Sequence, residues 1–170
     1  MHGDKAKILG IDYGDFTIGL AIFDVETDFI YPYKTIFREK ANILRKSLRE
    51  IIDVVKSEKI TEVVVGYPLN INGSEGERVA KVKIFAKMLN DKITQYENPT
   101  ESDTTSSDVA ENVATNHHIT IHFQDERLTT KEASEILSSR GIKKSEQKKL
   151  IDQVAAEIIL TDYKASSHNK

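Results

Sequence analysis

KILGIDYGDFTIGLAIFD, residues 7–24, is the stretch that decides the fold of this chain. It contains two apolar runs separated by Gly14-Asp15, a pattern typical of two strands joined by a hairpin turn. A third run of β-branched and aromatic residues follows a polar break at 26–28. The sequence therefore predicts three hairpin-linked strands, over about 7–12, 17–24 and 29–37.

Helices and strands alternate in the rest of the chain. Apolar residues at helical spacing or in short β-branched runs predict these elements. They are a helix at 41–59, a strand at 62–66, a helix to about 95, a strand at 118–124, and helices at 129–141 and 145–164. This order predicts an α/β fold, with a mixed five-stranded sheet flanked by helices.

Three helix ends carry sequence signals. Ser74 with Glu77, and Thr129 with Glu132, have the spacing of a capping box, in which the hydroxyl accepts a bond from a backbone N–H. Gly141 has the residue type that commonly ends a helix in a left-handed conformation. We therefore expect Ser74 and Thr129 to begin helices, and Gly141 to end one.

Composition limits the class of protein. The 170 residues fit one domain, and the absence of cysteine excludes disulfides and thiolate zinc sites. No apolar run is long enough for a signal peptide or a membrane span, so we expect a cytoplasmic protein. The polar stretch at about 97–117 cannot bury much apolar surface. We interpret it as a flexible insertion within a single domain spanning 1–170.

The net charge of −3 does not exclude a nucleic-acid partner. Glu97 to His118 contains five acids and no Lys or Arg, and the remainder has 24 basic against 22 acidic side chains. A local basic surface is therefore compatible with the composition.

Asp12 interrupts the first apolar run. A carboxylate in a buried strand is costly unless it is paired or binds a cation, and Gly10 and Gly14 allow a ligand to approach closely. The alternative is that Asp12 only caps a turn. The same Asp-x-Gly pattern also occurs in the phosphate loop of actin-like ATPases and sugar kinases.

Two further acids lie at informative places. Asp125-Glu126-Arg127 follows a predicted strand and precedes a helix, where α/β folds often carry their chemistry, although acids there also favour a helix N-terminus. Helical spacing puts Asp152 on the packed face of the last helix, with the more polar positions pointing away (Gln153, Glu157 and Thr161). Three acids from separate elements predict a site for Mg²⁺ or Mn²⁺, of the kind that hydrolyses phosphodiesters.

These residues resemble the YqgF/RuvX family of Holliday-junction-resolvase-like proteins, also described as pre-16S rRNA nucleases. Four blocks carry the resemblance: Gly10–Gly14 with Ile18–Ala21, Val65–Asn70 with Gly73–Gly76 and Arg78, Asp125–Thr130 with Glu132-Ala133, and Asp152–Ala156 with Ile159-Leu160 and Tyr163. Together they span nearly all of the chain outside the polar insertion.

The resemblance implies an RNase H-like fold and an endonuclease that matures the 5′ end of 16S rRNA. It also implies that Asp12, one acid of the Asp125–Glu126 pair and Asp152 form the active site. We assign Glu126 as catalytic residue and metal ligand, with Asp125 as a supporting residue or helix cap. Strand alternation puts the two on opposite faces, and sequence does not say which face holds the site.

Asn70, Arg78 and Arg127 are the candidate substrate-binding residues. The loop before the helix that contains Arg78 could hold a phosphate, and arginines suit phosphate contacts. The alternatives are a simple turn for Asn70 and surface ion pairs for the arginines. The family usually has a basic residue shortly after its first motif, where this chain has Asp15-Phe16-Thr17. Four lysines precede Asp152, and we interpret them as the solvent-exposed face of the last helix (Lys143, Lys144, Lys148 and Lys149).

Pre-rRNA is the expected partner, and branched DNA is an alternative. A non-catalytic nucleic-acid-binding domain is a second hypothesis, against which the presence of all three acids argues. An actin-like phosphotransferase is a third, but such enzymes need two RNase H-like lobes, and 170 residues have room for one.

Overall fold

The computed structural model describes residues 6–40, 43–99, 118–127 and 129–167. Within these ranges its elements follow the predicted order. They are β1 (Lys7–Tyr13), β2 (Thr17–Asp24), β3 (Phe29–Phe37), α1 (Arg45–Ser57), β4 (Ile60–Tyr67), α2 (Glu77–Glu97), β5 (Thr120–Asp125), α3 (Thr129–Ser139) and α4 (Lys144–Ser167). Most of the insertion expected at 97–117 lies outside the described residues.

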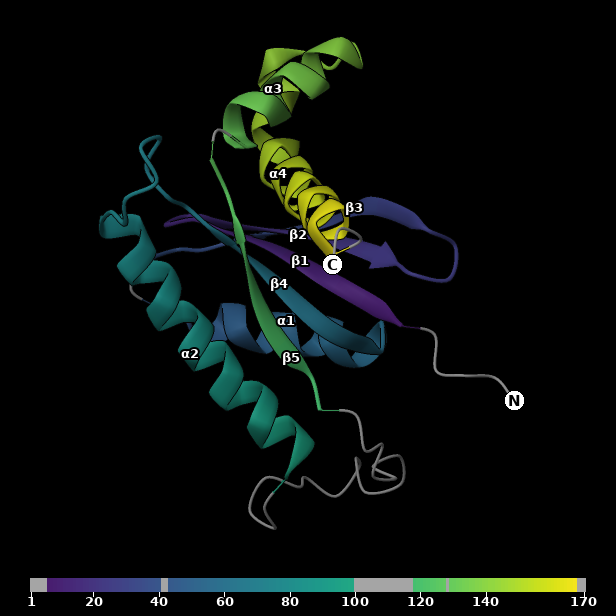
Figure 1. Cartoon of the computed structure of the whole chain (residues 1–170), viewed down its shortest axis with the longest axis vertical. Helices are drawn as coiled ribbons and strands as arrows, with labels where there is room; N and C mark the ends of the chain where they lie inside the picture. The colour runs from purple at the N-terminus through teal and green to yellow at the C-terminus, as the bar shows by residue number, and fades with distance from the viewer. Residues whose placement is uncertain (1–5, 41–42, 100–117, 128, 168–170) are drawn as a thin grey trace.

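The strands form one mixed sheet in the order β3-β2-β1-β4-β5 (Figure 1). The three hairpin strands pair antiparallel, whereas β4 pairs in parallel with β1 and β5. The prediction of a mixed five-stranded sheet is confirmed. Since β1, β4 and β5 run in the same direction, their last residues meet at one edge, the carboxyl end of the sheet.

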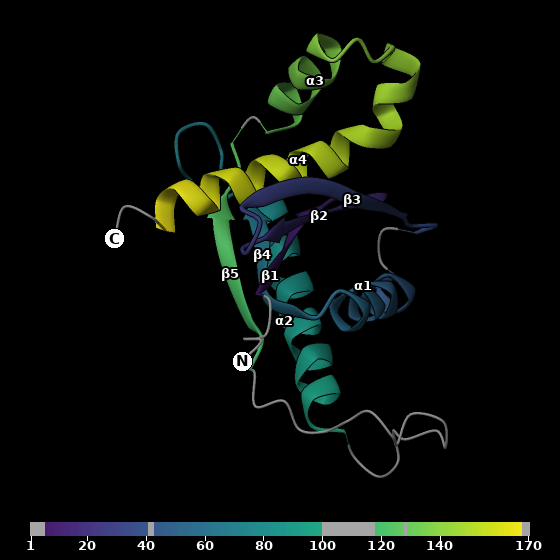
Figure 2. The same cartoon turned by 90° about the vertical axis from the view of Figure 1, so that its right-hand side faces the viewer.

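Helices cover both faces of the sheet (Figure 2). Leu9 and Ile11 of β1 pack with α1 and α2 in the main core, while Ile8 packs with α4 on the other face. This division follows from the alternation of side chains along a strand. α3 packs on the outside of α4 through a third apolar cluster that includes Ala133 and Leu137.

Gly10 allows α4 to cross close to the sheet. A Cβ atom on Gly10 would lie 2.5 Å from Leu160 Cγ and 2.9 Å from the carbonyl oxygen of Ala156, both on α4. Such distances are shorter than van der Waals contact, and the helix backbone cannot rotate away as a side chain can. The glycine therefore sets the depth at which α4 packs.

The predicted helix start at Ser74 is wrong. Gly76 is the N-cap of α2, and the Ser74 hydroxyl donates to Asn72 Oδ1 (2.7 Å) within the loop. α3 begins at Thr129 as predicted, but the Thr129 hydroxyl donates to Glu126 Oε1 and does not form the predicted capping box. Gly141 behaves as predicted, with φ of +75°, just after α3 ends.

No helix within the described ranges is both long and apolar enough to cross a membrane.

Gly10→Ala is expected to lower the free energy of unfolding by about 1–3 kcal/mol, because the added methyl group overpacks the contact between α4 and β1. Urea denaturation measures the change. Gly76→Ala is the matched control, since its Cβ would meet only the side-chain end of Asn70, at 3.1 Å. Equal losses in the two variants would contradict this account of Gly10.

Candidate active site

Asp12 lies near the end of β1, on the face that α4 covers, with only 6% of its surface exposed. Its partner across the antiparallel pair with β2 is Gly19. A Cβ on Gly19 would collide with the backbone carbonyl of Asp152 on α4, and it would lie 2.8 Å from the Asp152 Cβ. The missing side chain at Gly19 thus brings Asp152 down onto the sheet next to Asp12.

A second glycine makes room for Glu126. The backbone N–H of Glu126 donates to the carbonyl of Tyr67 at 2.9 Å, which turns the chain just after β5 back over the end of β4. A Cβ on Gly66 would collide with Glu126 Oε2. The carboxylate therefore lies over Gly66, and Thr129 Oγ1 donates to its other oxygen at 2.9 Å.

The two buried acids, Asp12 and Glu126, are each 6% exposed. Burial raises the pKa of Asp12 well above its ordinary value, and the nearby charges of Glu126 and Asp152 raise it further. Arg78 opposes these effects and lowers the pKa of Asp12. Glu126 Oε2 has no hydrogen-bond partner in the part of the chain that the structure describes. A buried acceptor without a donor is costly, and a bound cation would relieve that cost.

The structure distinguishes Glu126 from its neighbour Asp125. Asp125 Oδ2 accepts a bond from Arg127 Nε at 2.8 Å, in a partly exposed ion pair. Asp12, by contrast, lies close enough to Glu126 for the charge of Glu126 to raise the pKa of Asp12. The acid that lies beside Asp12 is therefore Glu126, and Arg127 is engaged with Asp125.

The three predicted acids do not form a closed donor cluster. Among the residues with described positions, no group of three or more His, Asp or Glu side chains is arranged to hold a metal ion. Asp12 and Glu126 form the close pair, and Asp152 is half-buried and acts on Asp12 through its charge. The site can thus offer a divalent cation two buried carboxylates, with a third at its margin.

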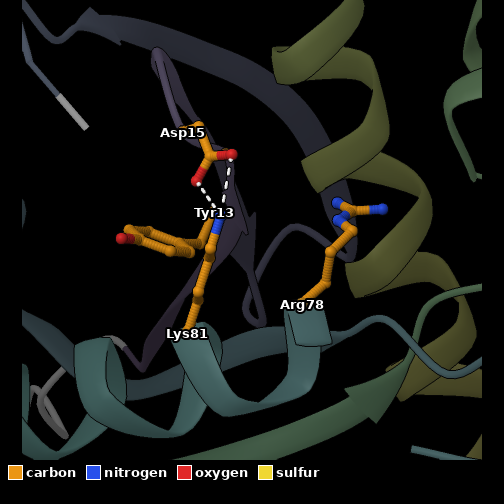
Figure 3. Close-up of a pocket in the computed structure, with 5 residues that line it drawn as sticks. Tyr13, Asp15, Arg78 and Lys81 are labelled. Carbon is orange, nitrogen blue, oxygen red and sulfur yellow. Dashed lines mark hydrogen bonds and ion pairs between the residues drawn. The ribbon is translucent and has the colours of Figure 1, made fainter. Parts of the chain in front are cut away.

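A small cavity of about 70 Å³ opens beside the end of β1, between Tyr13, the following turn and α2 (Figure 3). Lys81 binds both oxygens of Asp15 there, at 3.1 Å each. Arg78 extends from the first turn of α2 apart from that ion pair. Arg78 is exposed, and its charge lowers the pKa of Asp12.

Arg38, which sequence patterns did not single out, supports the turn after β1. The residue is 6% exposed, and its guanidinium donates to the carbonyl of Gly14 at 2.6 Å and lies 5.1 Å from the centre of the Tyr13 ring. Tyr13 in turn stacks on Phe85 of α2 at 4.3 Å. No local pattern signals this role, because Arg38 comes just after β3 and reaches the turn only through the pairing of β2 with β3.

Two other polar residues differ from simple expectation. The Asn70 side chain donates to Ser74 Oγ at 2.9 Å, so it closes its own loop. The expectation that Gln153 points away from the sheet is wrong, because its amide donates to Thr35 Oγ1 on β3 at 3.0 Å. A polar partner across the interface allows a polar side chain to occupy the packed face.

Comparison with known proteins gives consistent matches. A model of the family described as "RuvX: Holliday junction resolvase" matches residues 6–107 and 95–165. A "Putative pre-16S rRNA nuclease" of Carboxydothermus hydrogenoformans is 36% identical over 157 residues, covering 92% of this chain and 94% of that protein. One of the same name from Lachnospira eligens is 33% identical over 160 residues, covering 94% and 97%.

Among solved structures, RuvC of Thermus thermophilus in complex with a Holliday junction substrate matches with a TM-score of 0.51. The match covers 95% of this chain and 96% of that one, at 12% identity. Identity this low speaks for the fold alone. The expected RNase H-like α/β fold is thereby confirmed.

Asp12→Asn is expected to stabilise the protein at pH 8 and to have no effect near pH 3. The folded-state pKa of Asp12 is raised, so the cost of its charge is absent below the ordinary value of 3.8 and appears as the pH rises through the folded pKa. Thermal unfolding across this range measures the effect, at about 2–4 °C per kcal/mol for a chain of this size. Asp53→Asn, at an exposed position of α1, is the control and should change little at either pH. A gain that is independent of pH would contradict the assignment.

Proposed function

The chain belongs to the RuvX family of Holliday junction resolvases, and from this membership we propose that it is an endonuclease that processes the 5′ end of precursor 16S rRNA. Membership of this nuclease family makes the protein a hydrolase that acts on nucleic acid. The choice of ribosomal RNA comes from the names of its relatives. A cytoplasmic location, and one nuclease domain over 1–170 with an insertion at 97–117, belong to the same proposal.

The observation that carries the proposal is the buried acid pair at the carboxyl end of the sheet. Two carboxylates, each 6% exposed and adjacent, would repel each other unless protonated or bridged by a cation. The packing of the sheet does not by itself require acids there. Side chains larger than hydrogen at Gly19 and Gly66 would collide with Asp152 and Glu126, so these glycines leave the space that the acids occupy. A site that keeps such a costly pair is a candidate for chemistry.

Asp12 and Glu126 would hold Mg²⁺ or Mn²⁺, with Asp152 as the third carboxylate. The oxygen donors and the lone Glu126 Oε2 suit a hard cation. When bound, the ion supplies Lewis-acid stabilisation of the negative charge that grows on the phosphoryl oxygens.

The protein's own residues divide the remaining work. Arg78 neutralises and orients the phosphate, and Arg127 or Asn70 contacts the strand farther along. A water oxygen attacks phosphorus while the bond to the leaving oxygen breaks. Because Asp152 is the half-exposed acid, solvent reaches it, and we assign it the proton that the attacking water loses. The leaving oxygen takes a proton from solvent.

A Holliday junction is the second candidate substrate. The family is described by it, and the RuvC structure of the same fold holds one as its substrate. The choice between RNA and branched DNA is made by offering both substrates under identical conditions. Failure to cut either one would favour the remaining hypothesis, a nucleic-acid-binding domain without catalysis.

Asp12→Asn, Glu126→Gln and Asp152→Asn are each expected to slow cleavage of a precursor 16S rRNA fragment in Mg²⁺ or Mn²⁺ by about 100-fold or more, roughly 2.7 kcal/mol of transition-state stabilisation. Asp125→Asn is the matched control, since that carboxylate binds Arg127, and it should lose much less. Gel analysis of single-turnover reactions measures the rates. Three variants that cut as fast as wild type would refute the assigned site.

Mn²⁺ at 100 times its dissociation constant is expected to stabilise the wild-type protein by about 2.7 kcal/mol. The ion binds the folded site and relieves repulsion between the two buried carboxylates. Thermal unfolding with and without EDTA measures this without any substrate. The Glu126→Gln variant should gain far less, and an equal gain would place the ion elsewhere.

A further inference from the structure

Two phenylalanines are exposed at the carboxyl end of the sheet. Phe16, in the turn between β1 and β2, is 69% exposed, and Phe37, at the end of β3, is 65% exposed. Their backbones are neighbours, because Arg38 N–H donates to the Phe16 carbonyl at 2.8 Å and Thr17 pairs with Phe37. We call Phe16 and Phe37 the aromatic rim. Two large apolar side chains placed together in solvent do not stabilise this fold, and such patches often mark contact sites.

The aromatic rim lies next to the acids. Phe37 stands opposite Thr17, and Gly19, two residues farther along β2, stands opposite Asp12. Two residues along a strand span about 7 Å and two strand widths about 10 Å, so the Cα atoms of Phe37 and Asp12 lie roughly 12 Å apart. Phe16 itself follows Asp12 by four residues, across the Gly14 turn. A strand of nucleic acid with one phosphate at the acids would therefore bring bases about two nucleotides away to the rim.

An exposed lysine lies near Phe37, and the acid beside Phe16 is neutralised. Thr35, two residues before Phe37 on the same face, donates its hydroxyl to the backbone carbonyl of Lys149, so the first turns of α4 lie beside this end of β3. Lys148 is exposed and lies one helical turn before Asp152. On the side of Phe16, Lys81 neutralises Asp15, the one acid of that turn.

We propose that the aromatic rim stacks on unpaired nucleobases next to the bond that is cut, while Lys148 and Arg78 contact the flanking phosphates. The inference rests on the proposed nuclease function and specifies the substrate as single-stranded or splayed at the site. Aromatic side chains flanked by cations are the means by which proteins bind unpaired strands without reading their sequence. Bases inside a duplex cannot offer their faces, so a fully paired helix fits the rim poorly.

The test compares two 12-nucleotide fluorescein-labelled strands, oligouridylate and the same backbone with abasic sites at its centre. Binding is followed by anisotropy in the Asp12→Asn background, which keeps the strands intact. Phe16→Leu and Phe37→Leu should each weaken oligouridylate about 5- to 10-fold, the contribution of one stacked base. Binding of the abasic strand should change less than about twofold. The same measurements on deoxyribose versions of both strands show whether the rim substitutions weaken the binding of RNA or of DNA more. The nucleic acid with the larger loss of affinity is the one whose bases the rim contacts.

Phe29→Leu is the matched control, because Phe29 lies at the other end of β3 and is equally open, at 62%. It should leave both affinities unchanged. Lys148→Ala should weaken both strands alike, since phosphates remain when bases are removed.

The outcomes separate this inference from the nuclease assignment. If wild type cuts RNA and the two rim variants bind like wild type, the rim inference fails and the nuclease stands. If wild type neither binds nor cuts any strand, both fail. If Phe16→Leu/Phe37→Leu instead turns a dimer into a monomer in sedimentation, without a base-dependent loss, the rim is a contact between copies and the inference is overturned.

Discussion

The site depends on how closely α4 and the chain after β5 approach the sheet around Asp12. Gly10, Gly19 and Gly66 lie on one face, on three neighbouring strands, and each faces an atom that a Cβ would strike. Leu160 occupies the space over Gly10, Asp152 the space over Gly19, and Glu126 the space over Gly66. Since a packed interior cannot yield by an ångström, these absent side chains set the depth of α4 and the distance between the acids.

Because the acids are buried close together, their negative charges destabilise the folded state. Burial and the neighbouring carboxylates raise the pKa of Asp12, and Arg78 offsets only part of that rise. Thr129 satisfies one oxygen of Glu126. Most of the other buried side chains of the sheet are apolar, so the unfavourable burial of charge is concentrated where β1, α4 and the chain after β5 meet. Strain confined in this way is typical of sites built for a ligand.

The end of the sheet also separates two kinds of surface. Acids lie inward, under α4, while cations and exposed aromatic rings lie outward, around the turn after β1. Arg38 holds that turn from beneath through the Gly14 carbonyl and the Tyr13 ring. These contacts fix the position of the turn that carries Phe16.

Local rules were enough for the element order, the mixed sheet and the role of Gly141, because hairpin runs, helical spacing and a left-handed glycine act within a few residues. They also selected Asp12 and Asp152, whose apolar settings are visible in the sequence. The capping boxes and Gln153 went wrong, since Asn72, Glu126 and Thr35 competed for those side chains. Only the tertiary structure shows that Glu126, and not Asp125, lies beside Asp12. That placement depends on the pairing of β5 with β4, more than 50 residues earlier, and on the bond from the Glu126 N–H to the Tyr67 carbonyl.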